Sequence, residues 1–276
     1  MTVQRFSVGR FDCVAVLDGV NLYTPEQFFA NAPADELARY SLGDEIRSAY
    51  SCLLVDTGVH RVVVDTGGRG LGPEVGRFAE GFAETGWKRA DVDTVVITHA
   101  HPDHIGGNID AAGDPTFPNA RVVLQRAEWD YWTAEATLET APPVFAEPVR
   151  TQLLPLRDRI DLLDGDGPIV PGIAAVDARG HTPGHMAVGV ESGGDELLYI
   201  ADAAVHPVQL EHPDWVALFD IEPDWTVASR RRVFDRAADA GSLVQAFHFY
   251  PFPGLGRVTR QDGGWRWAPT DPGKQS

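Results

Sequence analysis

Short apolar runs separated by turn residues dominate the first third of the chain. Residues 13–17 and 51–55 have the composition of strands, and the second run leads through Asp56-Thr57-Gly58 into a further apolar run at 61–65. Two apolar runs joined by such a turn predict a β-hairpin. The chain therefore opens with the pattern of a sheet.

Helical spacing appears between and after these runs. Residues 73–87 place apolar side chains on one face of a helix, and a second helix is predicted at 224–240, where Asp224 can cap the first turn and Gly241 can end the last. Residues 22–45 are rich in proline, alanine and acidic residues. They predict a short helical or irregular excursion that could serve as a lid or as an arm in a dimer.

Some predicted strands end directly at a histidine. Residues 92–98 form a nearly continuous apolar run, as in a strand buried on both faces, and lead into His99; residues 243–247 lead into His248. The other strand candidates are 121–125, followed by a helix with Trp129 and Trp132, then 173–177, 186–191 and 197–201, with a closing hairpin at 257–267. Each half of the chain contains strands, a helix and a strand that delivers a histidine, which predicts a two-sheet core with helices outside.

The composition fits a folded domain of enzyme size. A length of 276 residues allows one large domain or two small ones, and we expect a single domain over 1–276. The net charge of −17 would repel long anionic partners, and the chain has no extended basic run, so we expect no nucleic-acid binding. The nearest basic run, Arg230-Arg231-Arg232, is interpreted as a solvated helix face.

The two cysteines, Cys13 and Cys52, lie far apart with no second pair, so we expect small buried residues in strands rather than a zinc knuckle or a disulfide framework. Residues 1–10 have no long apolar stretch behind a basic start. No window reaches the roughly 18 apolar residues of a membrane span. The expected location is cytoplasmic, with no membrane partner.

The strongest chemical signal is the run His99-Ala100-His101-Pro102-Asp103-His104. Four potential ligands fall within six positions, and neutral imidazole with carboxylate is the ligand type expected for zinc and similar divalent ions. A tight loop can present such side chains to two neighbouring metals. Gly106 and Gly107 allow the backbone to leave without steric conflict. A histidine-rich surface loop that binds nothing is the alternative.

Further ligands are expected from loops that lie far away in the sequence. Residues 180–185 supply His185 after a Pro-Gly turn, Asp202 follows an apolar strand, and His248 lies in an apolar setting. A single histidine in an apolar run is more often a hydrogen-bonded core residue. Together with the first motif, however, these residues complete two coordination shells.

The combined motifs resemble the hallmark of the metallo-β-lactamase superfamily, His-x-His-x-Asp-His with a later His, Asp and His. The resemblance also covers Asp65-Thr66-Gly67 and implies an α/β fold, an αββα sandwich of two mixed β-sheets flanked by helices, with the site along one edge. It implies two divalent ions, with zinc expected and manganese, iron or cobalt as alternatives. The ligands it implies are His99, His101, His185 and Asp202 for one metal, and Asp103, His104, Asp202 and His248 for the other, with Asp202 as the bridge.

A mechanism follows from the charge of two such ions. A water that they share has a lowered pKa, so hydroxide forms near neutral pH and attacks a carbonyl carbon or a phosphorus. Asp103 and Asp202 are the residues expected to accept or pass a proton. Asp65 is expected either to orient the ligands by hydrogen bonds or to cap a turn. His181 is expected to support the ligands or to be structural, and the histidines taken as non-ligands are His60, His206 and His212.

Sequence details narrow the branch of the superfamily. His101 stands where the diiron flavoprotein branch usually has an acid, and Asp202 stands where many zinc β-lactamases have Cys or Ser. Reduction of dioxygen is therefore disfavoured, and β-lactam hydrolysis is a secondary alternative. Residues 182–185 resemble glyoxalase II, which keeps thioester hydrolysis open, although the tail lacks a basic cluster for glutathione. Residues 248–256 resemble the His-x-Pro-Phe-Pro-Gly-x-Gly stretch of methyl parathion hydrolase and its relatives, with Tyr250 as one extra residue.

The methyl parathion hydrolase group includes acyl-homoserine lactonases, arylesterases and phosphotriesterases, which implies a small, neutral and fairly apolar substrate. A non-catalytic metal-binding protein is the alternative from another class, and the complete ligand set argues against it. A homodimer is left open. The candidates for an aromatic pocket wall are Trp129, Trp132, Trp215, Phe219, Tyr250 and Phe252, although ordinary core packing is the simpler explanation for any one of them.

Overall fold

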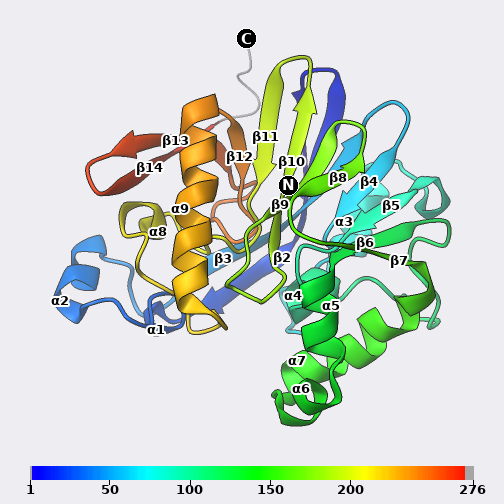
Figure 1. Ribbon diagram of the computed structural model, residues 1–276, viewed down its shortest axis with the longest axis horizontal. Coiled ribbons are helices and arrows are strands. Elements are labelled where there is room, and N and C mark those ends of the chain that lie inside the picture. Colours follow the sequence, from blue (N-terminus) through cyan, green and yellow to red (C-terminus); the bar gives the residue numbers. More distant parts are fainter. Residues whose placement is uncertain (1, 271–276) are drawn as a thin grey trace.

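The computed structural model describes residues 2–270, which form two mixed β-sheets with helices on their outer sides (Figure 1). The described part of the first sheet has seven strands in sequence order: β1 (Val3–Val8), β2 (Phe11–Tyr23), β3 (Ile46–Asp56), β4 (Arg61–Val64), β5 (Thr94–Val96), β6 (Arg121–Gln125) and β7 (Ile160–Leu163). The second has seven in the spatial order β14 to β8: β8 (Gly167–Val170), β9 (Ile173–Asp177), β10 (Met186–Ser192), β11 (Asp195–Tyr199), β12 (Leu243–Gln245), β13 (Leu255–Gln261) and β14 (Gly264–Pro269). The αββα class predicted above is confirmed.

Helices cover the outer faces of both sheets. The described helices are α1 (Pro25–Phe28), α2 (Ala34–Leu37), α3 (Phe78–Glu84), α4 (Pro102–Ile105), α5 (Arg126–Thr133), α6 (Glu135–Thr140), α7 (Pro143–Pro148), α8 (Val208–Glu211) and α9 (Pro223–Ala240), with short helical turns at Ala38–Tyr40, Arg89–Asp91, Val149–Leu153 and Leu154–Arg159. Figure 1 shows the long helix α9 in front of β12, and α5 to α7 beside the β6–β7 end of the first sheet. None of the helices within residues 2–270 is long and apolar enough to cross a membrane.

Parallel strand pairs bring the sequence-predicted polar residues to one edge. Strand β4 runs parallel to β5 in the first sheet, and β11 runs parallel to β12 in the second. Because parallel neighbours end at the same edge of a sheet, the residues that follow them emerge together. The residues after these four strands include Asp65, His99, Asp202 and His248.

A hydrophobic core joins the two sheets. Buried side chains of β2, β3 and β4 share one cluster with those of β10 and β11, and α9 closes a second cluster through Val233 and Phe234. Full burial of such a side chain contributes roughly 1.5–3 kcal/mol. Cys13 and Cys52 lie buried and free in strands, as predicted.

The helix predicted at 73–87 forms only over Phe78–Glu84. The buried carboxylate of Asp18 accepts hydrogen bonds from the backbone N–H groups of Gly68, Gly76 and Phe78 at 3.1, 2.8 and 2.9 Å. Gly76 has a φ of +89°, which ends any helical path there. A distant acid thus holds residues 73–77 as a loop, which local periodicity does not reveal.

The strand predicted at 92–98 is also shorter, because the sheet ladder covers only Thr94–Val96. The backbone N–H of Thr98 donates instead to Asp65 Oδ1 at 2.9 Å. The residue directly before His99 is therefore held by an acid from the end of β4, whereas the Ile97 N–H still donates to the Val123 carbonyl in β6.

The interpretation of Arg230-Arg231-Arg232 as a solvated face is wrong for Arg230. Its side chain is 1% exposed and donates to the backbone carbonyls of Ala203, Pro213 and Trp215. Only Arg231 and Arg232 lie toward solvent. Helix α9 therefore uses one arginine to hold the loop that follows Asp202.

The excursion at 22–45 contains the end of β2, the short helices α1 and α2 and a helical turn, as predicted. Phe28 and Phe29 are buried with Val205 and Trp215 in a third apolar cluster. The excursion therefore packs over the loop after Asp202, where it lies beside the site.

Candidate metal centre

The His99–His104 motif lies in a loop and a single helical turn. His99 follows β5, and His101 directly precedes α4, whose first turn carries Asp103 and His104. Pro102 suits the first position of a helix because its ring fixes φ and its missing N–H has no partner there. The turn holds four candidate ligands against the edge of the sheets, all of them buried.

The second sheet supplies residues that face this motif. Asp202 Oδ2 lies 3.0 Å from His248 Nε2, and Asp202 Oδ1 lies 3.2 Å from His104 Nε2. Asp103 Oδ2 lies 3.4 Å from His248 Nε2. Side chains from residues about 100 to 145 positions apart in the sequence therefore converge.

Three overlapping groups of ligand atoms result, each with its atoms within 4.8 Å of one another. Within residues 2–270 these groups are His99, His101 and His181; His99, His104 and Asp202; and Asp103, His104 and His248. Three buried atoms of these groups have no hydrogen-bond partner, namely His99 Nε2, His104 Nε2 and Asp202 Oδ1. Orphaned buried polar atoms are costly, and a shared cation would satisfy them. The donor set therefore fits divalent metal ions.

His185 is the one expected ligand that lies outside these groups, whereas His181 belongs to one of them. The Nε2 atom of His185 accepts a hydrogen bond from the Asp202 backbone N–H at 3.1 Å, and its Nδ1 pairs with the Ala178 carbonyl at 2.8 Å. Both ring nitrogens are thus occupied. His181 instead directs Nε2 to within 2.9 Å of His101 Nδ1 and 3.3 Å of Asp202 Oδ2.

Buried partners fix the rings of the facing histidines. His104 Nδ1 lies 2.8 Å from Asp65 Oδ2, and His181 Nδ1 lies 2.7 Å from Asp220 Oδ1. A carboxylate that accepts from Nδ1–H leaves Nε2 with its lone pair toward the centre. Asp65 therefore orients ligands, the first of its two predicted roles. His248 Nδ1 has Ser48 Oγ at 2.8 Å in the same position.

Two residues at the site hold unusual backbone conformations. Asp65 has a φ of +59° and Ala201, directly before Asp202, has a φ of +44°. Such values are uncommon outside glycine and cost free energy unless surrounding contacts enforce them. In both cases the strained residue follows a strand and helps to position a carboxylate: that of Asp65 behind His104, and that of Asp202 at the centre.

Burial and neighbouring charges shift the ionisation of the cluster. Burial, with help from His104, lowers the pKa of His99 well below its usual value, which keeps the ring neutral near pH 7. Burial also opposes the charged form of His104, but the carboxylates of Asp202 and Asp65 outweigh it and raise the pKa of His104. Against burial, His248 and His104 lower the pKa of Asp202. The ionised Asp202 carboxylate thus favours positive charge beside it, either as protons on the histidines or as metal ions.

Glu128 is a buried residue beside the site that the sequence did not point to. Its fully buried carboxylate accepts four hydrogen bonds, from the backbone N–H of Ala100 and of Gly184, the Thr182 hydroxyl and the Trp132 indole, at 2.7–2.9 Å. It thereby ties the His99–His104 loop to the loop of His181. The only sequence signal was an acidic residue in an aromatic-rich helix, and this pattern is equally typical of an acid that faces solvent. Asp220, in the loop before α9, was missed as well.

Two neighbouring cavities lie beside the centre. A cavity of about 280 Å³ is lined by Asp103, Asp202 and His248 together with aromatic residues. A second, of about 570 Å³, is mostly apolar and shares His101, Phe145 and Phe219 with the first. Aromatic side chains therefore surround the approach to the ligands.

Only two of the six aromatic residues predicted for the pocket wall lie in these cavities, Trp132 and Phe219. Trp129 and Phe252 pack on the main core, and Trp215 is buried against Phe29. Tyr250 is 41% exposed beneath the Arg47 guanidinium. The other aromatic wall residues are Tyr23, Phe28, Tyr50, Tyr131 and Phe145.

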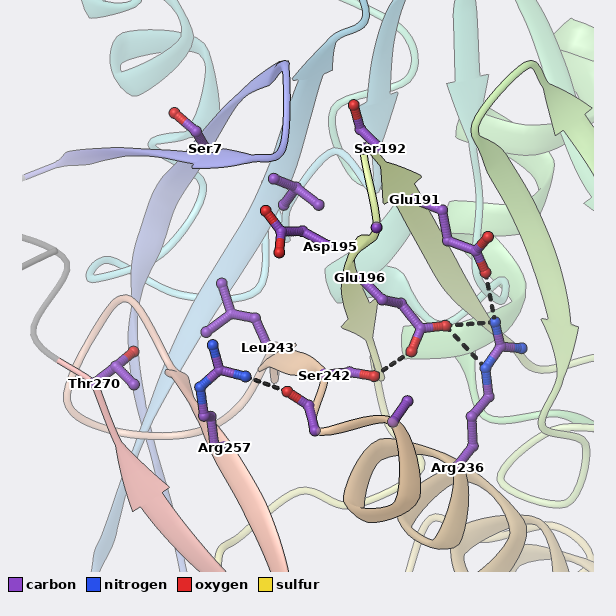
Figure 2. Close-up of a pocket in the computed structure, with 15 residues that line it drawn as sticks. Ser7, Glu191, Ser192, Asp195, Glu196, Arg236, Ser242, Leu243, Arg257 and Thr270 are labelled. Atoms are coloured by element: carbon purple, nitrogen blue, oxygen red, sulfur yellow. Dashed lines mark hydrogen bonds and ion pairs between the residues drawn. The ribbon is translucent and has the colours of Figure 1, made fainter. Parts of the chain in front are cut away.

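A larger cavity of about 1060 Å³ lies at the other end of β11, around Asp195 (Figure 2). Arg236 contacts Glu191 and Glu196 there, and Arg257 donates to the backbone carbonyl of Gly241. None of the candidate ligands lines this cavity.

The three histidines predicted as non-ligands all lie outside the ligand groups. His60 pairs with Asp93, and His212 stacks on Trp215. His206 accepts a hydrogen bond from the Val208 backbone N–H at 3.2 Å.

Comparisons with known proteins agree with this geometry. The profile of the metallo-beta-lactamase superfamily matches residues 47–247. An N-acyl homoserine lactonase of a Bacillus species is 28% identical over 183 residues, which cover 62% of this chain and 66% of the relative. One from Bacillus cereus is 27% identical over 196 residues, covering 62% and 70%. The chain thus aligns with about two thirds of the length of these relatives.

Two solved structures are similar over nearly the whole chain. The hydrolase AbOPH of the beta lactamase superfamily superposes with a TM-score of 0.89 at 25% identity, covering 98% of both chains. AidC, described as a dizinc quorum-quenching lactonase in complex with a product N-hexanoyl-L-homoserine, gives a TM-score of 0.86 at 25% identity, covering 98% of this chain and 97% of its own. The chain belongs to the metallo-beta-lactamase superfamily.

Proposed function

We propose that this protein hydrolyses a small, neutral lactone or ester that carries an apolar substituent, with two divalent metal ions at the centre. The main support for this proposal is that three overlapping groups of candidate ligands lie beside an apolar, aromatic-lined cavity. The lactonase relatives support the choice of an acyl-bearing lactone.

The ligands we propose for one ion are His99, His101, His181 and Asp202. Those for the other are Asp103, His104, Asp202 and His248. Asp202 is assigned as the bridge because its carboxylate oxygens lie 3.0–3.3 Å from histidines of both sets, His104, His181 and His248. Zinc is the proposed metal, since the donors are imidazoles and carboxylates. When bound, the two ions supply a water of lowered pKa and a Lewis acid for the substrate oxygen.

Asp103 is the residue we assign to accept the proton of the attacking water. Its side chain is 11% exposed, against 4% for Asp202, and it lines the smaller cavity. In the overall reaction a water oxygen bonds to the carbonyl carbon, the bond between that carbon and the ring oxygen breaks, and the leaving oxygen takes up a proton. Asp103 is placed to hold the proton between these two events.

The cavities favour a substrate with little charge. The larger one is walled by Trp132, Phe145 and Phe219. Two exposed apolar side chains also line the cavities, Leu218 the larger and Val144 the smaller. Such a wall favours an acyl or aryl group through burial of its apolar surface. No arginine or lysine lines either cavity in the described part of the chain, so a free carboxylate or phosphate on the substrate would have no countercharge.

A metal-loaded preparation assayed on a γ-lactone with an acyl chain, an aryl ester and an aryl phosphotriester tests this function. We expect the lactone to give the highest kcat/KM and elemental analysis to find two metal ions per chain. The matched control is Asp103→Asn, which keeps the shape of the side chain but removes its charge.

Other outcomes would redirect the assignment. Preference for the phosphotriester would overturn the lactone substrate but keep the two-metal hydrolase. Activity only on a thioester or a β-lactam would favour the alternatives left open by the sequence. Full activity after complete removal of metal by a chelator would contradict the proposed centre itself.

A further inference from the structure

Three polar side chains form a network in the wall of the smaller cavity. The Asn21 amide Nδ2 donates to the Tyr50 hydroxyl oxygen at 3.1 Å, and the hydroxyls of Tyr23 and Tyr50 share a short hydrogen bond. All three residues line the same cavity as Asp103 and His248. We call Tyr23 and Tyr50 the hydroxyl pair.

This network leaves one hydroxyl proton without an acceptor. The hydroxyl pair has two O–H protons, and the bond between the two oxygens uses one of them, whichever tyrosine donates. Asn21 donates to Tyr50 and so uses no hydroxyl proton. Within residues 2–270 no other acceptor pairs with either hydroxyl. One O–H proton therefore remains without a protein partner.

The surroundings hold the pair in place. Tyr50 is fully buried and meets the His248 ring edge-on, with centroids 5.3 Å apart. Tyr23 stacks on Phe28 with centroids 4.6 Å apart. Burial, together with the charge of Asp103, raises the pKa of both tyrosines, so both keep their protons near neutral pH. A fixed donor without an acceptor costs free energy unless something in the cavity accepts from it.

We propose that the hydroxyl pair donates this spare hydrogen bond to a second acceptor oxygen of the substrate, apart from the carbonyl that is hydrolysed. The inference rests on the proposed function and deepens it. Such a hydrogen bond would favour those apolar lactones and esters that carry a second amide or ester oxygen near the reacting group. No other hydroxyl side chain lines this cavity in the described part of the chain.

Two lactones of equal size separate this role from general packing. One is N-hexanoyl homoserine lactone, which carries an amide carbonyl, and the other is a γ-butyrolactone with a plain alkyl chain of matched length at the same carbon. Because either tyrosine can carry the spare proton, the decisive variant is the double substitution Tyr23→Phe with Tyr50→Phe. We expect its KM to rise about 3- to 10-fold for the amide lactone and to stay within about 2-fold for the alkyl lactone. Each single variant should show a smaller change.

A binding measurement gives a readout apart from turnover. The lactam analogue of the amide lactone, which is not readily hydrolysed, should bind the double variant about 3- to 10-fold more weakly by calorimetry. Tyr40→Phe is the control, since the Tyr40 hydroxyl contacts His212 and Glu211 and lies outside both cavities beside the centre. It should leave both lactones and the lactam unaffected.

Equal losses on both lactones would assign the pair a purely structural role and overturn the inference, as would no loss on either. Failure of the unmodified protein to cleave any lactone would instead overturn the proposed function. In that case the lactam measurement still tests the hydroxyl pair. Weaker lactam binding by the double variant would support the proposed hydrogen bond. Lactam binding that is absent or unchanged contradicts it.

Discussion

The Nδ1 atom of His181 lies 2.7 Å from Asp220 Oδ1, with both side chains almost wholly buried. This pair directs His181 Nε2 toward His99, His101 and Asp202. Asp220 Oδ2 accepts in turn from the Ala217 backbone N–H at 2.8 Å. The histidine is thus aimed from a loop that follows it by nearly 40 residues.

His181→Ala should therefore remove a ligand, whereas His185→Ala should not. We expect elemental analysis to find fewer than two metal ions per chain in His181→Ala, with kcat/KM reduced by more than about 100-fold. His185→Ala should keep two ions and lose about 1–3 kcal/mol of stability, because the Asp202 N–H and the Ala178 carbonyl lose their partner. The reverse pattern would restore His185 as the ligand.

Asp220→Asn should weaken metal binding without removing a ligand. The amide can still pair with His181 Nδ1, but it no longer favours the tautomer that frees Nε2. We expect metal affinity, measured by competition with a chelator, to fall by about 10- to 100-fold. Unchanged affinity would show that Asp220 only fixes the loop.

Glu128→Gln should loosen both ligand loops at once. The amide keeps one acceptor oxygen but turns an NH₂ group toward two donors, so about two hydrogen bonds are lost. We expect a loss of about 3 kcal/mol in the free energy of unfolding, measured with urea, and weaker metal binding. Asp130→Asn, at an exposed position of the same helix, should change stability by less than about 0.5 kcal/mol. Equal effects of the two substitutions would refute the special role of Glu128.

Arg230 and Arg231 form a matched pair of neighbours with opposite environments. Arg230→Ala leaves three buried carbonyls without their donor and opens a cavity beside α9, so we expect a loss of about 3–5 kcal/mol in unfolding free energy. Arg231→Ala removes only an exposed ion pair with Asp214 and should cost less than about 1 kcal/mol. Urea unfolding of both variants measures the difference.

His206 should make the metal-free protein sensitive to mild acid. Burial lowers the pKa of His206 to about 4, from an ordinary value of 6.5. Between these values the unfolded chain binds the proton and the folded one does not, so stability is complete above pH 6.5 and falls as the pH approaches 4. We expect His206→Asn to recover up to about 2 kcal/mol of the stability lost between pH 7 and pH 4.5. An identical pH dependence in the variant would exclude His206 as the cause.

Residue types and spacing were enough to predict most of the strands, the helix that became α9, and six members of the candidate centre. The His99–His104 motif could be read directly because its ligands lie within one turn of chain, so that local geometry alone brings them together. Asp202 and His248 followed from apolar strands that end at a polar residue. These features depend on short-range order.

The choice between His181 and His185 depended on the tertiary structure. Both histidines lie in one short loop, and their spacing does not say which ring faces the centre. Asp220 pairs with His181 Nδ1, and the Asp202 backbone N–H donates to His185 Nε2, so the structure favours His181 as the proposed ligand. Both partners come from elsewhere in the chain. Glu128 was missed and Arg230 was misjudged for the same reason. A charged helix residue can be buried only if distant groups form hydrogen bonds with it, and the periodicity of the sequence does not reveal those groups. The residue types along this chain set which chemical groups it offers for binding metals. Three-dimensional packing sets which of these groups meet, because hydrogen-bond partners far along the chain orient each ring.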